Sequence, residues 1–157
     1  MSLVFKQLEN SILLLVGAGK INEYLNQCYK LGIQDKVIFA GPIPFSEIPD
    51  YLAITDVVVN PRINCPGMPQ KLINYMMAGK AIVSFEGSAK LLSDRVDGFV
   101  VQNGDVKQMA DDIITLLKND ELRLRLGENA RSKIANNFEW NFLAKKIEKI
   151  YIRLLEK

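Results

Sequence analysis

The stretch from Asn60 to Lys80, NPRINCPGMPQKLINYMMAGK, holds the residues best suited to bind an anion. An apolar run ends at its start, a polar loop follows, and a helix is predicted to begin near Pro69, because proline suits the first helical position. Met68 precedes that proline and has no capping oxygen, so the N–H groups of residues 70–72 are expected to stay free. A helix start with free N–H groups attracts phosphate, and Gly67 lets a ligand approach the backbone closely.

Two side chains of the same helix extend this predicted anion site. Lys71 brings a positive charge into the first turn, where the helix dipole disfavours it, and a nearby phosphate would explain that misfit. Asn74 lies about one turn further on the same face and has the donors and acceptor needed to bind ribose hydroxyls. The alternatives are that Lys71 simply points to solvent and that Asn74 is a tolerated exposed amide.

Loops after the other predicted strands offer further contacts, because ligands of an open parallel sheet bind beyond the carboxyl ends of its strands. The candidate residues of this nucleotide crevice are Gly17, Gly19, Gly41, Glu86 and Ser88. The first glycine turn matches no nucleotide motif: a Walker A loop needs Ser or Thr in place of Ile21, and a dinucleotide fingerprint needs a third glycine in place of Asn22. That turn is therefore either a tight entry into a helix or a wall of the crevice. Glu86 and Ser88 are either donor contacts or ordinary loop residues.

Short apolar runs alternate with segments of helical spacing up to about residue 105. The runs predict strands at residues 11–17, 36–41, 56–61, 81–85 and 98–101. They do not alternate strictly between apolar and polar residues, which is typical of strands covered on both faces. The pattern predicts an α/β fold, a Rossmann-like doubly wound parallel sheet.

From residue 105 onward the chain is predicted to be wholly helical, with Asp105 and Asp120 opening the first two of three helices. Residues 118–157 carry ten Lys/Arg and six Asp/Glu, whereas residues 1–117 carry ten and twelve. The basic excess is either a solvated outer face or a weak attraction to an anionic membrane surface.

The composition excludes several classes of function. The absence of histidine removes imidazole bases, Ser-His triads and His-ligated metal sites. A net charge of +2 is too small for a general nucleic-acid-binding domain, so we expect no nucleic-acid partner. Two separated cysteines favour a reduced compartment, no run reaches the roughly 20 residues of a membrane span, and no signal peptide opens the chain. We therefore expect a cytoplasmic protein, with peripheral contact at the inner face of the membrane as an alternative.

The ordered motifs resemble the C-terminal, donor-binding domain of group 1 retaining glycosyltransferases, a large family with two Rossmann-like domains (the GT-B fold). Residues 67–80, GMPQKLINYMMAGK, are similar to the family's Gly-x-Pro-x-Lys-Leu-x-Glu-Tyr-Met-Ala-x-Gly-Lys. Residues 37–41, 51–61, 97–105 and 138–140 resemble further segments of the family in the same order. The resemblance covers about residues 11–153.

This resemblance implies a nucleotide-sugar donor, usually a UDP or GDP sugar, and transfer with retention at the anomeric carbon. The residues expected to bind the donor diphosphate and sugar are Gly67, Met68, Gln70 and Lys71, and Asn74 falls on the family's ribose-binding glutamate. The family normally needs no metal, because backbone amides, a helix N-terminus and basic side chains hold the diphosphate. We therefore expect no metal and no cofactor, and no residue stands out as a nucleophile or general base.

Two departures from the family pattern concern its pair of glutamates. Pro66 stands where the first glutamate would be, so the usual carboxylate contact to the donor sugar is absent. Asn74 replaces the second, and a neutral amide in place of a charge-assisted bond costs about 1–2 kcal/mol of donor binding. Both departures favour an atypical donor or a weakened enzyme.

The resemblance also implies that the chain is part of a longer protein. Residues 1–3 look like an expression leader, and the family's first strand and its whole acceptor domain would precede residue 1. We therefore expect residues 1–157 to be a nucleotide-sugar-binding fragment that is inactive alone and works with its own N-terminal acceptor domain.

The leading hypothesis is thus the donor half of a retaining hexosyltransferase that serves a glycan or lipid-linked acceptor, as in bacterial envelope polysaccharide synthesis. The second is a degenerate, non-catalytic module that binds nucleotide or protein, as suggested by Pro66 and Asn74. The third is a flavodoxin-like signalling domain, which would need an acidic cluster after the first strand that the glycine turn does not offer.

Overall fold

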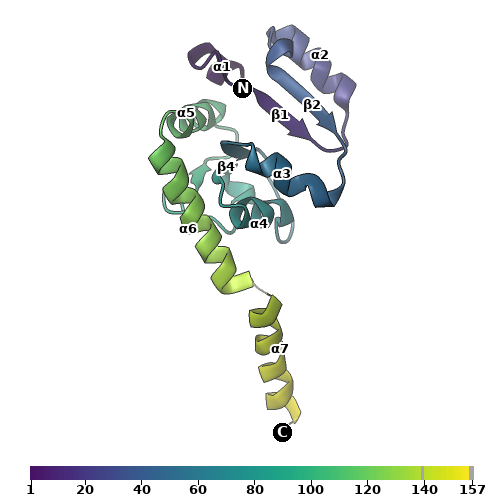
Figure 1. Cartoon of the computed structure of the whole chain (residues 1–157), viewed down its shortest axis with the longest axis vertical. Coiled ribbons are helices and arrows are strands. Elements are labelled where there is room, and N and C mark those ends of the chain that lie inside the picture. Colours follow the sequence, from purple (N-terminus) through teal and green to yellow (C-terminus); the bar gives the residue numbers. More distant parts are fainter. Residues whose placement is uncertain (139, 156–157) are drawn as a thin grey trace.

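The structure, a computed structural model, describes residues 1–138 and 140–155, without the side chains of residues 137 and 140–143 (Figure 1). Its first part contains α1 (Ser2–Gln7), β1 (Leu13–Val16), α2 (Ile21–Leu31), β2 (Val37–Gly41), α3 (Ile48–Ala53), β3 (Val57–Asn60), α4 (Gln70–Met77), β4 (Ala81–Phe85) and β5 (Phe99–Val101). Three short 3₁₀ turns, η1 (Gln34–Lys36), η2 (Phe45–Glu47) and η3 (Glu86–Ser88), interrupt the loops. Helices α5 (Val106–Leu117), α6 (Asp120–Phe138) and α7 (Trp140–Leu155) follow. The predicted alternation and the helical C-terminal part are confirmed. Of the 138–140 resemblance, residue 139 and the side chain of Trp140 lie outside the described residues.

All strand pairs are parallel, as predicted, but their hydrogen bonds divide them between two sheets. One sheet has the order β1-β2 and the other the order β3-β4-β5. In Figure 1 the β1-β2 pair lies with α2 beside the larger part of the molecule, which contains α4, α5 and α6. Among the described strands, β1 and β3 therefore each have a partner on one edge only.

The prediction that the strands are covered on both faces is confirmed for the β3-β4-β5 sheet at its central strand, and it is wrong for β1 in the β1-β2 sheet. Every residue of β4 is buried, because α4, α5 and α6 all pack against it. No residue of β1 is fully buried, and the side chain of Val16 is 40% exposed. An apolar run alone cannot distinguish the two cases, because burial of β1 depends on neighbours that the run does not encode.

Local signals explain how the helices begin and meet. Asp105 caps α5 as predicted, with its carboxylate accepting from the Gln108 N–H at 2.9 Å. Gly127 lies within α6, where glycine is unfavourable, because a Cβ at that position would lie 2.0 Å from the carbonyl oxygen of Gly79 at the end of α4. The missing side chain thus lets α6 approach α4 closely.

The core consists of two large apolar clusters and a smaller one. The first joins β4 and β5 with α5, and the second joins β3 and β4 with α4 and α6. Helix α1 connects the parts, since Val4 packs in the first cluster and Phe5 in the small cluster under α2 and β2. Of residues 1–3, expected to be a leader, Ser2 and Leu3 are the first residues of this helix, and Met1 at its N-cap packs against the first and the small cluster.

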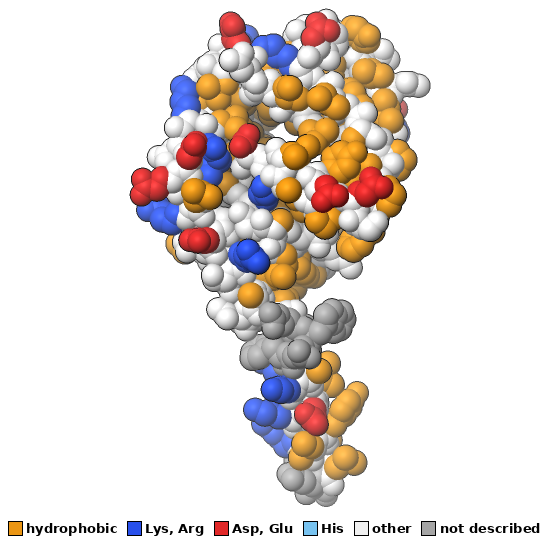
Figure 2. Space-filling model, viewed as in Figure 1, with side chains coloured by type: hydrophobic (Ala, Val, Ile, Leu, Met, Phe, Trp, Pro, Cys, Tyr) orange, Lys and Arg blue, Asp and Glu red, His pale blue; other side chains and the backbone are white. Residues whose placement is uncertain are grey.

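Helix α7 extends away from the rest of the molecule (Figure 1). Its apolar residues remain exposed from Ile147 onward, and Figure 2 shows them on one side of the helix with lysine and arginine side chains on the other. No helix within residues 1–138 and 140–155 is long and apolar enough to cross a bilayer.

Candidate functional site

The start of α4 has the open geometry predicted from the sequence, with two corrections. No side chain caps the helix, and Pro69 occupies the N-cap position rather than the first helical position. The Leu72 N–H, expected to be free, donates to the Pro69 carbonyl at 2.9 Å, because a 3₁₀-type bond closes the first turn. Within the described part of the chain, the backbone N–H groups of Gln70 and Lys71 have no protein acceptor.

The loop before α4 places the predicted diphosphate residues at the surface. Gly67 has a φ of +86°, a conformation that favours glycine, and no atom lies within 4 Å of the place where a Cβ would be. Met68 is 52% exposed, and Gln70 and Lys71 are exposed as well. The structure therefore brings these four residues together around open space, whereas Asn74 lies half-buried one turn further along the helix.

A second loop, residues 86–90 after β4, holds this first loop in place. The Cys65 N–H donates to the Gly87 carbonyl at 3.3 Å, and the Lys90 ammonium donates to the Gly67 carbonyl at 3.0 Å. A Cβ on Gly87 would lie only 1.7 Å from the Ile63 carbonyl oxygen, so the two backbones can approach only because residue 87 is glycine. Sequence reasoning missed Gly87 and Lys90, because neither belongs to a recognisable motif.

Beneath the two loops, three buried polar side chains form a network. Asn60, the last residue of β3, donates from Nδ2 to the hydroxyls of Ser84 at 3.1 Å and Ser88 at 3.0 Å. Ser88 in turn donates to the Arg62 carbonyl at 2.7 Å. Ser84 and Ser88 are fully buried. The Ser88 hydroxyl thus supports the loop from below, and the donor contact expected of Ser88 stays a prediction.

Glu86 remains exposed, and its carboxylate accepts from the Asn103 N–H at 3.2 Å. The side chain of Asn103 returns a bond by accepting from the Gly87 N–H at 3.1 Å. The loops after β3, β4 and β5 are thus joined at the carboxyl ends of the strands, where a parallel sheet binds ligands.

The remaining crevice glycines belong to the other sheet. Gly17 follows β1, and its N–H donates to the carbonyl of Gly41 at the end of β2, at 2.8 Å. Both have positive φ values and open space at the Cβ position, whereas a Cβ on Gly19 would meet only the Tyr24 ring at 3.6 Å. Among the described residues, no hydrogen bond joins these turns to the Gly67 loop, so their part in the crevice stays a prediction.

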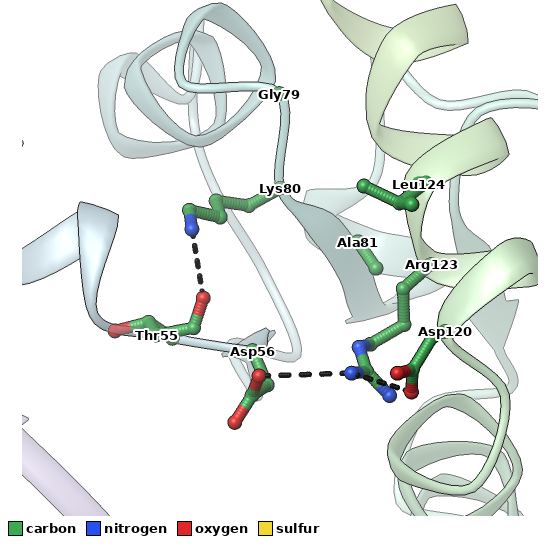
Figure 3. Close-up of a pocket in the computed structure, with 8 residues that line it drawn as sticks. All are labelled: Thr55, Asp56, Gly79, Lys80, Ala81, Asp120, Arg123 and Leu124. Carbon is green, nitrogen blue, oxygen red and sulfur yellow. Dashed lines mark hydrogen bonds and ion pairs between the residues drawn. The ribbon is translucent and has the colours of Figure 1, made fainter.

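A cavity at the opposite edge of the second sheet is filled with structural contacts (Figure 3). There the Lys80 ammonium donates to the carbonyls of Ala53 and Thr55 at 3.0 and 2.9 Å. Arg123 pairs with Asp120 at 2.9 Å and also donates to two carbonyls at the end of α5. The charged groups of this cavity hold elements together, which leaves the Gly67 loop as the better candidate site.

The chemistry around the Gly67 loop is that of an anion site. Lys90 brings its ammonium to the loop and Lys71 is exposed in the first turn of α4, and neither forms an ion pair within the described residues. The described residues contain no cluster of His, Cys, Asp or Glu able to hold a metal ion. One turn after Lys71 in α4, burial raises the pKa of the Tyr75 phenol above its usual 10.0, so this group stays neutral and packs against the core.

Comparison with known proteins is consistent with this geometry. Residues 1–133 match the sequence model of the glycosyl transferases group 1. Over 149 residues the chain is 29% identical to an uncharacterized glycosyltransferase, MJ1069, of Methanocaldococcus jannaschii, covering 94% of this chain and 38% of that protein. Over 113 residues it is 30% identical to the N,N'-diacetylbacillosaminyl-diphospho-undecaprenol alpha-1,3-N-acetylgalactosaminyltransferase of Campylobacter jejuni, covering 71% and 30%. The chain thus spans well under half the length of these relatives.

Among solved structures, Anabaena Alr3699/HepE in complex with UDP superimposes with a TM-score of 0.83 at 20% identity, covering 96% of this chain and 44% of that one. At this identity the likeness shows the fold, the Rossmann-like half of a GT-B glycosyltransferase. Together with the family match over most of its length, it shows that this chain belongs to the group 1 glycosyltransferases.

Proposed function

We propose that this chain is the donor-binding, C-terminal half of a retaining glycosyltransferase that moves a sugar from UDP or GDP to a glycan or lipid-linked acceptor. The single observation that carries the proposal is the uncapped start of α4 beside an open glycine loop. Its two free N–H groups and the Lys71 ammonium are suited to a diphosphate. The UDP complex of the Anabaena protein and the undecaprenol-linked acceptor in the name of the Campylobacter relative support the donor and acceptor classes.

In this proposal the site acts mainly on the leaving group. Negative charge develops on the diphosphate as its bond to the sugar breaks, and fixed N–H dipoles with a nearby ammonium stabilise that charge. No metal or cofactor is required, because these groups balance the phosphates. The acceptor would be bound by an N-terminal domain of the full-length protein, so this chain alone would be inactive. The basic face of α7 would give peripheral contact with the inner face of the membrane.

The second candidate is a degenerate module that binds a nucleotide without chemistry. It is favoured by one specific observation: the half-buried Asn74 amide and Pro66 stand where the family has glutamates, and neither can supply a carboxylate to the donor. The two candidates agree on nucleotide binding and differ on turnover.

Titration of UDP, GDP and their sugars into the full-length protein, followed by a hydrolysis and transfer assay, tests both candidates. We expect binding of at least one nucleoside diphosphate and turnover of its sugar. Lys71→Ala should lower the affinity for the nucleoside diphosphate by about tenfold and the affinity for the corresponding nucleoside by less than about twofold. Binding without turnover across a wide donor panel would support the module, and no nucleotide binding at all would refute both.

A further inference from the structure

Lys90 is placed to be a second phosphate-binding cation, although no sequence motif marks it. It is the last residue of the loop 86–90, which contacts the Gly67 loop before α4. Three contacts between these loops, from Gly87 and Ser88, involve backbone or buried groups and are structural. The fourth is the exposed Lys90 ammonium, 3.0 Å from the Gly67 carbonyl oxygen.

The surroundings of this ammonium make the carbonyl a weak partner for it. Gly67 is exposed and has open space above its Cα. The two acidic residues four positions away in the chain are engaged elsewhere: the carboxylate of Glu86 accepts from the Asn103 N–H and that of Asp94 from the Val100 N–H. Within the described residues Lys90 has no carboxylate partner. An ammonium held by one neutral oxygen at the surface exchanges readily for an anion, which binds it more strongly.

The position also complements the rest of the proposed site. The unpaired N–H groups of Gln70 and Lys71 lie only three and four residues after Gly67. Lys71 belongs to the first turn of α4 and Lys90 to the neighbouring loop, so the two cations lie on two different elements. A diphosphate has two charged groups, and cations on separate elements suit both better than a single lysine does.

We infer that Lys90 binds the diphosphate of the nucleotide, exchanging the Gly67 carbonyl for phosphate oxygens when the donor enters. This inference rests on the proposed function and adds a residue to it. No bond is made or broken in the exchange; one hydrogen bond of the ammonium is replaced by charge-assisted ones. The exchange also frees the Gly67 carbonyl and so couples the loop to the presence of ligand.

The test uses the full-length protein and compares Lys90→Gln, Lys90→Arg and a matched control, Lys118→Gln. Lys118 is an exposed lysine just beyond the C-terminal end of α5, so its replacement changes the charge equally without approaching the Gly67 loop. Calorimetric titration would compare UDP, UMP and uridine, or the guanosine series if the wild type prefers it. We expect Lys90→Gln to lower the affinity for the nucleoside diphosphate by about tenfold and the affinity for the nucleoside by less than about twofold. Lys90→Arg should retain most of the affinity, and the control all of it.

The possible outcomes separate this inference from the proposed function. If the wild type binds UDP or GDP and Lys90→Gln binds it equally well, the inference fails and the proposed function stands. If Lys90→Gln lowers the affinities for the nucleoside and for the diphosphate by the same factor, the residue only positions the loop, and the inference fails as well. If the wild type binds no nucleotide, the proposed function itself fails. Weaker dependence of diphosphate affinity on salt in Lys90→Gln would support a direct ionic contact.

Discussion

Replacing Gly87 with alanine tests whether the contact between the two loops builds the donor site. The new Cβ would lie 1.7 Å from the Ile63 carbonyl oxygen and 2.7 Å from its carbon, so the backbones must separate by more than 1 Å. That shift breaks the bond from Cys65 to residue 87, which is already 3.3 Å long. Overpacking and the lost hydrogen bond together should lower the free energy of unfolding by about 3 kcal/mol.

Gly127→Ala is the matched control for this experiment. Its Cβ would lie 2.0 Å from the Gly79 carbonyl, a comparable backbone collision, but between α4 and α6 and away from the candidate site. The better helix propensity of alanine offsets part of the cost, so we expect a loss of about 2 kcal/mol. Urea denaturation of both variants measures these losses.

The two variants should differ in nucleotide binding under conditions where both are folded. Displacement of the Gly67 loop in Gly87→Ala should lower the affinity for UDP or GDP by about tenfold. The reason is that the N–H groups at the start of α4 and the Lys90 ammonium would no longer face the same phosphates. Gly127→Ala should bind as the wild type does. Equal affinity of the wild type and Gly87→Ala, or an unfolding midpoint unchanged by the substitution, would refute the claim that residue 87 shapes the site.

Four further outcomes follow from the same structure. Asn60→Leu should cost about 2 kcal/mol in urea unfolding, because the hydroxyls beneath the loop lose a buried donor; a neutral substitution would contradict the network. Lys133→Met should cost about 2 kcal/mol in thermal unfolding, because the Asp97 carboxylate, 3% exposed and 2.6 Å from the ammonium, stays buried without that cation; an unchanged melting temperature would oppose this. Because burial raises the pKa of Tyr75, the phenol ionises at lower pH in the unfolded chain than in the folded one, and wild-type stability should fall as pH rises above about 10. Tyr75→Phe should lessen this fall. Parallel curves of stability against pH for the two proteins would count against the effect. Backbone amides on the unpaired edges of β1 and β3 should exchange faster with deuterium in this chain alone than in the full-length protein, and equal protection would speak against a missing neighbour.

Sequence patterns predicted best the elements whose signals are local. The mainly apolar run at residues 81–85 forms the fully buried β4, and the Asp105 cap begins α5 where expected. The uncapped start of α4 was also predicted, since the absence of a capping side chain before Pro69 can be read directly. Two details differ: Pro69 is the N-cap rather than the first helical residue, and the Leu72 N–H is bonded, because a 3₁₀ turn closes within the backbone without any sequence signal.

The contacts that hold the site could not be predicted, because each joins segments 16 or more residues apart. Gly87 reads as an ordinary loop glycine until the Ile63 carbonyl is placed against it. Ser88 follows a strand end, the position expected for a ligand contact, yet it turns inward to Arg62 and Asn60. A rule about strand ends identifies the correct loops but not which way each side chain points.

The division into two sheets explains where the candidate site lies and what it needs. A doubly wound sheet of order 3-2-1-4-5-6 binds ligands where the order reverses, between strands 1 and 4. The observed orders β2-β1 and β3-β4-β5 fit strands 3-2 and 4-5-6 of this scheme, which places the reversal beside the unpaired edge of β3. The loop that follows β3 is the Gly67 loop. Its hydrogen bonds to the loop after β4, which is bonded in turn to the loop after β5, therefore hold one wall of the crevice in place. Under the proposed function, a strand of the full-length protein would lie between the two sheets and complete the β1 side.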